Sequence, residues 1–172
     1  MVRLTLIGTL LLAVTLAEDA AAQRRRPDAP AATEGKGIVD VSIIAQVGTQ
    51  AYTSRVPGTC KHAPMASIYD VPAALWSVQA DGSGGSEIKR LSFTLWRPKD
   101  GSADQVSIAL DAGSGSNQIE VNPRKTVGVA TVQLKPVGPG GKFEVRGKDA
   151  KGTKVYLTIS CPMFAGVEAE GG

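Results

Sequence analysis

From Ile38 onward, apolar and polar residues alternate along most of the chain. Alternation with a period of two places one row of side chains on one face of a β-strand. Beyond the N-terminal region, no window longer than about ten residues shows helical periodicity. The alternating segments are 39–47, 52–56, 76–80, 90–95, 106–110, 119–121, 127–134, 143–145 and 155–161. The pattern therefore predicts an all-β domain of eight or nine strands.

Glycine and proline residues separate these segments. The stretches "DGSGGS" at 81–86 and "VGPGG" at 137–141 are typical of hairpin turns, and "VPG" at 56–58 is expected to end the second strand. One strand and one turn together take roughly ten to fifteen residues, which favours an antiparallel β-sandwich. A closed or partly open β-barrel is the alternative, because both architectures share this rhythm.

The N-terminal residues have the layout of a secretory signal peptide. Arg3 precedes an apolar run of 13 residues from Leu4 to Leu16, and small residues follow at 20–22. The run is shorter than the roughly 20 residues that a helix needs to cross a bilayer. We therefore expect residues 1–22 to be a signal peptide rather than a transmembrane segment. The protein is expected to be secreted or periplasmic.

The rest of the chain divides into three parts. Residues 23–37 lack large apolar side chains and are expected to form a flexible linker. Residues 38–164 are expected to form the β-sandwich domain, and residues 165–172 a flexible C-terminal tail. Near the start of the linker, Arg24, Arg25 and Arg26 could make a weak contact with an anionic surface.

The charge of the chain argues against nucleic-acid binding. The formal net charge is +3 at pH 7, and beyond the linker residues of both signs are scattered along the sequence. This distribution is typical of a solvated surface rather than of the basic patch that a nucleic-acid partner requires. We therefore expect the partner to be a protein or a glycan.

The two cysteines are predicted to form a disulfide. An exported protein meets an oxidising compartment, and an even number of cysteines favours pairing. Joining Cys60 to Cys161 would close a loop of about 100 residues, for which the chain-entropy model gives roughly 4 to 5 kcal/mol of stabilisation.

A copper site is the alternative interpretation of the same residues. The segments "CKHAPM" and "CPM" would place Cys60, His62, Met65 and Met163 close together if the cysteines are neighbours in space. Thiolate, imidazole and thioether groups favour cuprous copper. However, the chain has a single histidine, and a disulfide would consume both thiolates. The main prediction is therefore no metal and no cofactor.

No motif indicates catalysis. The "GxSxG" nucleophile motif is absent, and His62 is the only histidine available as a base. Carboxylates suited to glycoside hydrolysis are present but occur in any chain of this size, and such an enzyme also needs a cleft that separates two of them. We expect the protein not to be an enzyme.

Aromatic residues give the best positive indication of function. Trp76 falls in an apolar row and is expected to fill the core, whereas Trp96 falls in the polar row of its strand and is expected to point away from the main core. The alternative is that a loop covers Trp96, since large apolar residues are usually buried. Exposed Trp96 and Tyr69 could stack on a sugar ring or anchor a partner protein. The sequence thus predicts an exported, non-enzymatic binding or interaction domain. A carbohydrate-binding module is the first alternative, and a periplasmic copper-binding protein is the second.

Overall fold

The computed structural model describes residues 37–113 and 115–167, which form one sheet of eleven strands. The predicted signal peptide and all of the predicted linker except Gly37 lie outside the described residues. The strands are β1 (Ile38–Val47), β2 (Gln50–Ile68), β3 (Val71–Asp81), β4 (Ile88–Pro98), β5 (Gln105–Ala112), β6 (Gly115–Val121), β7 (Thr126–Val127), β8 (Val129–Val137), β9 (Gly140–Lys148), β10 (Lys154–Cys161) and β11 (Ala165–Gly166).

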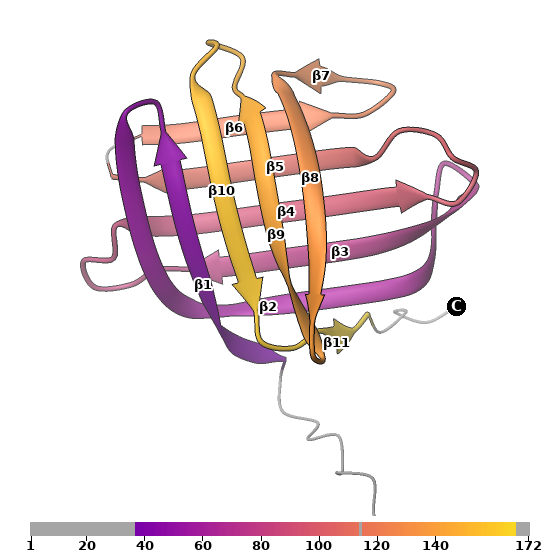
Figure 1. Ribbon diagram of the computed structural model, residues 1–172, viewed down its shortest axis with the longest axis horizontal. Coiled ribbons are helices and arrows are strands. Elements are labelled where there is room, and N and C mark those ends of the chain that lie inside the picture. Colours follow the sequence, from indigo (N-terminus) through magenta and orange to yellow (C-terminus); the bar gives the residue numbers. More distant parts are fainter. Residues whose placement is uncertain (1–36, 114, 168–172) are drawn as a thin grey trace, which may run out of the picture. The chain divides into compact units, whose positions relative to one another are not determined.

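The sheet curls into a half-barrel with two layers. The strand order is β7-β6-β5-β4-β3-β2-β1-β10-β9-β8, and every neighbouring pair on this path is antiparallel. In Figure 1, β1, β8, β9 and β10 form the front layer, and their strands cross those of β3 to β6 behind them. The prediction of an all-β sandwich or partly open barrel is confirmed.

Strand β2 belongs to both layers. Its residues 50–59 pair with β1, and its residues 58–68 pair with β3. Gly58 and Thr59 are therefore paired on both sides. Strand β2 bends where the sheet passes from one layer to the other (Figure 1). The prediction that residues 56–58 end a strand is wrong. Proline and glycine here bend a continuous strand instead of ending it, because Gly58 has no side chain to separate the layers.

The core lies between the two layers and consists of the inward rows of the strands. Phe93 of β4 and Phe143 of β9 meet across it, with ring centroids 4.9 Å apart. Trp76 is buried in the same core, as predicted. The buried apolar side chains of the described residues all lie within the compact unit Glu34–Gly172, so this unit contains a hydrophobic core of its own.

The predicted disulfide between Cys60 and Cys161 is present, with the Cα atoms 6.1 Å apart. Cys60 pairs with β3 of the rear layer, and Cys161 pairs with β9 of the front layer. In the sheet order β1 separates β2 from β10, so the bond links strands that share no backbone pairing. It thus ties the two layers together, and it is compatible with an extracytoplasmic location.

The chain continues past the last long strand. Ala165 and Gly166, in the segment expected to be a tail, form β11 and pair in parallel with Lys61 and His62 of β2. Residues 168–172 of the predicted tail lie outside the described residues. None of the described residues forms a helix long and apolar enough to span a bilayer.

Candidate binding groove

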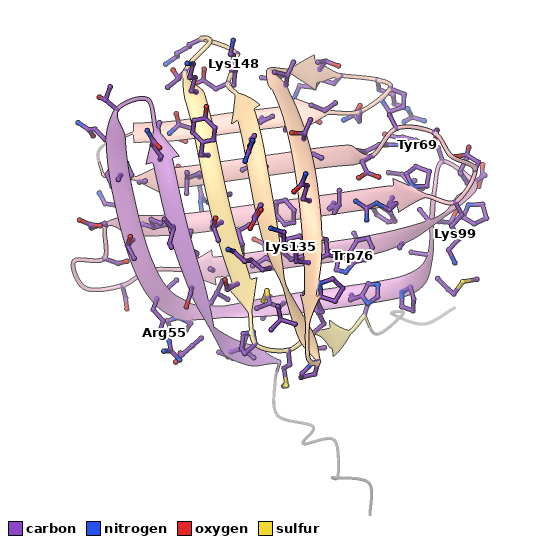
Figure 2. All side chains as sticks on the ribbon, viewed as in Figure 1. Arg55, Tyr69, Trp76, Lys99, Lys135 and Lys148 are labelled. Carbon is purple, nitrogen blue, oxygen red and sulfur yellow. A yellow bond between two sulfur atoms is a disulfide. The ribbon has the colours of Figure 1, made fainter. Side chains whose placement is uncertain are left out.

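The hairpin between β2 and β3 carries the first residue of the candidate site. Tyr69 and Asp70 form its turn, and both have positive φ angles of 49° and 65°. A tight hairpin turn of this kind normally uses asparagine and glycine, since the left-handed region is unfavourable for a bulky side chain. The guanidinium carbon of Arg124 lies 4.1 Å from the centroid of the Tyr69 ring and packs against its face. Tyr69 is exposed at the right-hand edge of the molecule in Figure 2.

The second residue, Trp96, comes from β4 on the rear layer. It lies in the outward row and is half-buried, so it is not part of the core, as its position in the polar row predicted. Tyr69 and Trp96, which are 27 positions apart in the sequence, line one groove of about 210 Å³. The full lining is Ile68, Tyr69, Thr94, Trp96, Gln105, Val106, Ser107, Val121 and Asn122.

Gln105 is a lining residue that the sequence did not single out. It begins β5 and lies directly opposite Trp96 in the sheet. The residue is only 8% exposed, and the amide oxygen Oε1 has no hydrogen-bond partner among the described residues. A buried acceptor without a partner is costly, and this oxygen could accept a hydrogen bond from a ligand once the side chain turns toward the groove. No feature of the sequence around residue 105 distinguishes this glutamine from a surface residue.

Uncharged side chains line the groove, and its polar groups are the Gln105 and Asn122 amides and the hydroxyls of Tyr69, Thr94 and Ser107. A positive charge lies beside it, because the Arg124 guanidinium packs on the Tyr69 ring. Asn122 is held in place: its Nδ2 donates to Glu120 at 3.0 Å, and its Oδ1 accepts from the backbone of residues 124 and 125. A hydrogen bond from Lys125 keeps the pKa of Glu120 below its ordinary value, so this acceptor stays ionised.

The residues of the alternative copper cluster do not form a set of metal ligands in the structure. The disulfide takes both cysteine sulfurs, which leaves no thiolate for a metal. His62 stacks on Trp76, with ring centroids 4.6 Å apart and an angle of 7° between the planes. Met65 is 76% exposed and contacts Lys99, while Met163 is exposed after β10. Among residues 37–113 and 115–167, no group of three or more His, Cys, Asp or Glu side chains could hold a metal ion.

The His62 ring is one link in an aromatic series between the layers. Phe164 lies 6.0 Å from His62 and 5.9 Å from Phe143, measured between ring centroids. At the other end, the Arg97 guanidinium lies 5.7 Å from the Trp76 ring and forms a two-pronged ion pair with Asp104. The segment "CKHAPM" therefore contributes to the disulfide and to core packing.

His62 is expected to make the stability of the protein depend on pH. Burial lowers the pKa of its imidazole from the ordinary value of 6.5, so folding favours the neutral ring. The stability contributed by this group is full above pH 6.5 and is lost as the pH falls through the lowered pKa of the folded state. The midpoint of thermal unfolding should therefore decrease slightly between pH ~7 and pH ~5.

The variant His62→Phe isolates this effect. It keeps a ring to stack on Trp76 but cannot titrate, and the chain has no other histidine. Its unfolding midpoint should change less than that of the parent protein over this range. Equal changes in the two proteins would assign the pH dependence to carboxyl groups instead.

A second, more open groove of about 420 Å³ lies between residues 53–57 of β2 and the loop at residues 83–87. The hydroxyls of Ser54 and Ser86 lie 2.9 Å apart there, and Glu87 accepts a hydrogen bond from the backbone of Thr53. Among the described residues, no buried side-chain polar atom of this groove lacks a hydrogen-bond partner, which distinguishes it from the groove at Gln105.

The sequence matches no protein-family model and has no significant match among curated proteins or solved structures.

Proposed function

We propose that this chain is an exported, non-enzymatic binding module whose groove between Tyr69 and Trp96 takes a neutral sugar. The observation that carries the proposal is the combination of two aromatic rings with a buried, unpartnered amide oxygen in one small groove. Aromatic faces stack on the apolar faces of sugar rings, and amide and hydroxyl groups bind the sugar hydroxyls.

The size and charge of the groove support this choice of ligand. Drug-sized ligands occupy pockets of roughly 300 to 1,000 Å³, so a groove of about 210 Å³ suits a single ring rather than an extended molecule. The absence of charged lining residues favours a neutral sugar over a sugar acid or a phosphate. The N-terminal signal pattern and the disulfide support an extracytoplasmic location, where free glycans and cell-surface polysaccharides are found.

Trp96→Ala tests the proposal. The parent protein should bind one class of neutral glycan on a glycan array, and Trp96→Ala should weaken that binding about fivefold or more, because loss of a central aromatic contact is expected to cost about 1 kcal/mol or more. Gln105→Leu should also weaken binding, but with little loss of thermal stability, since it removes a buried acceptor that has no partner.

Tyr156→Ala is the matched control. Tyr156 is also an exposed aromatic residue, but it lies on β10 of the front layer, away from the groove lining. Its substitution should leave glycan binding unchanged. No binding to any neutral glycan, or equal binding by the parent and Trp96→Ala, would contradict the proposal.

A further inference from the structure

The charges of the domain are unevenly distributed between its parts. Residues 129–161, which form β8, β9 and β10, contain six lysine or arginine residues and two acidic residues. The other described residues contain eight basic and eight acidic residues, so the whole net charge of the described chain, +4, comes from these three strands. Charges of both signs are scattered along the sequence, but basic residues predominate in this part of the molecule.

The sheet register collects these charges on one side. Five of the six basic residues occupy outward positions of adjacent strands and form what we call the basic face: Lys135, Lys142, Arg146, Lys148 and Lys154. Lys135 and Lys148 lie on the layer that faces the viewer in Figure 2. Glu144 lies among them, where Lys135 and Lys142 hold the pKa of its carboxyl group below its ordinary value.

This face contains two pairs of like charges, and the two residues of each pair lie directly opposite each other on neighbouring strands. Lys148 is opposite Lys154, and Lys135 is opposite Lys142. Facing like charges destabilise a sheet. Glu144 binds both lysines of the second pair, but no ion pair is present for Lys148 or Lys154 among the described residues. Asp149, the other acidic residue of this region, is buried and accepts hydrogen bonds from its own turn. The first pair is thus left without compensation.

Apolar side chains are exposed between and beside these lysines. Ile44 of β1 and Tyr156 of β10 point outward on the front layer and are 56% and 42% exposed, and Val129 and Val137 are exposed on β8. The outward row across β3, β4 and β5 has a different character, with Ser77, Thr94 and Ser107 side by side. The front layer alone combines a net positive charge with exposed large apolar groups.

We propose that the basic face docks the domain on an anionic lipid surface. Lysine side chains can keep their charged ends among lipid headgroups while their stems cover apolar surface. The exposed Ile44 and Tyr156 side chains would enter the boundary between the headgroups and the acyl chains of the bilayer. A soluble acidic polymer would satisfy the lysines but would leave these apolar groups in water. The docking uses the layer opposite to the sugar groove, so it does not depend on the function proposed for that groove.

Sedimentation with lipid vesicles tests this docking. The chain from Gln23 onward is used, because it contains the whole compact unit and lacks the apolar run at residues 4–16. It should sediment with vesicles of phosphatidylcholine and phosphatidylglycerol, but not with phosphatidylcholine alone, and added salt should release it. The double variant Lys148→Gln, Lys154→Gln should lower the partition coefficient roughly thirty-fold.

The matched control is Lys61→Gln, Lys89→Gln, which removes the same charge from two exposed lysines outside the basic face. It should sediment like the parent protein, and all variants retain Arg24, Arg25 and Arg26. The Lys148, Lys154 variant should melt no lower than the parent, because it loses a repulsion. Equal losses in both double variants, no binding to anionic vesicles, or binding to a soluble acidic polysaccharide but not to vesicles would each overturn the proposal.

Discussion

Loss of the disulfide between Cys60 and Cys161 is expected to lower the free energy of unfolding by about 4 to 5 kcal/mol. The two residues are 101 positions apart, so the bond removes much of the freedom of the unfolded chain. It also joins β2 to β10, which have no backbone pairing with each other, at the place where β1 begins. The effect is measurable by denaturant unfolding of the double variant Cys60→Ala, Cys161→Ala beside the parent protein.

The reducing agent provides the control for this prediction. Reduction should destabilise the parent protein and should leave the double variant unchanged, because that variant has no thiol. In the native, unreduced protein both cysteines should fail to react with a thiol reagent, a result that would also leave no thiolate for copper. A difference in unfolding free energy below about 1 kcal/mol would mean that the unfolded chain is already compact in this region.

Alternation alone predicted most of the fold, because strands with one buried face repeat the alternation of buried and exposed side chains along their length. Strand β10 is the clearest case, since Val155, Leu157 and Ile159 are buried and the residues between them are not. The pattern failed at β2, where Pro57 and Gly58 have the composition of a turn. Whether such residues end a strand or bend it depends on the next strand that pairs there, and the local sequence does not contain that information.

The candidate groove could be predicted only in part. Tyr69 and Trp96 were found as separate aromatic residues, and the hairpin turn at Tyr69 is what places both in one groove. Gln105 could not be found, because its burial depends on the side chains of neighbouring strands. The basic face was hidden for a related reason: its residues alternate with buried ones along β9, and only the register aligns them with those on β8 and β10.

Gly58→Ala is expected to lower the free energy of unfolding by about 2 to 3 kcal/mol, because the bend in β2 has no space for a side chain. A Cβ atom at this position would lie 2.4 Å from the carbonyl oxygen of Gln79 and 2.9 Å from Cγ2 of Val41. The carbonyl belongs to the β3 backbone, so relief requires movement of the strand rather than of one side chain. The two layers would then have to separate at the bend.

Gly115→Ala is the matched control, since it is also a strand glycine without a positive φ angle. The nearest atom to its Cβ would be the Ala112 carbonyl oxygen at 3.8 Å, an ordinary contact. It should change stability by less than about 1 kcal/mol, and in the favourable direction if reduced freedom of the unfolded chain dominates. Both values come from denaturant unfolding at one pH. If the two variants proved equally stable, the bend would tolerate a side chain, and the close approach of the layers would not be what requires glycine there.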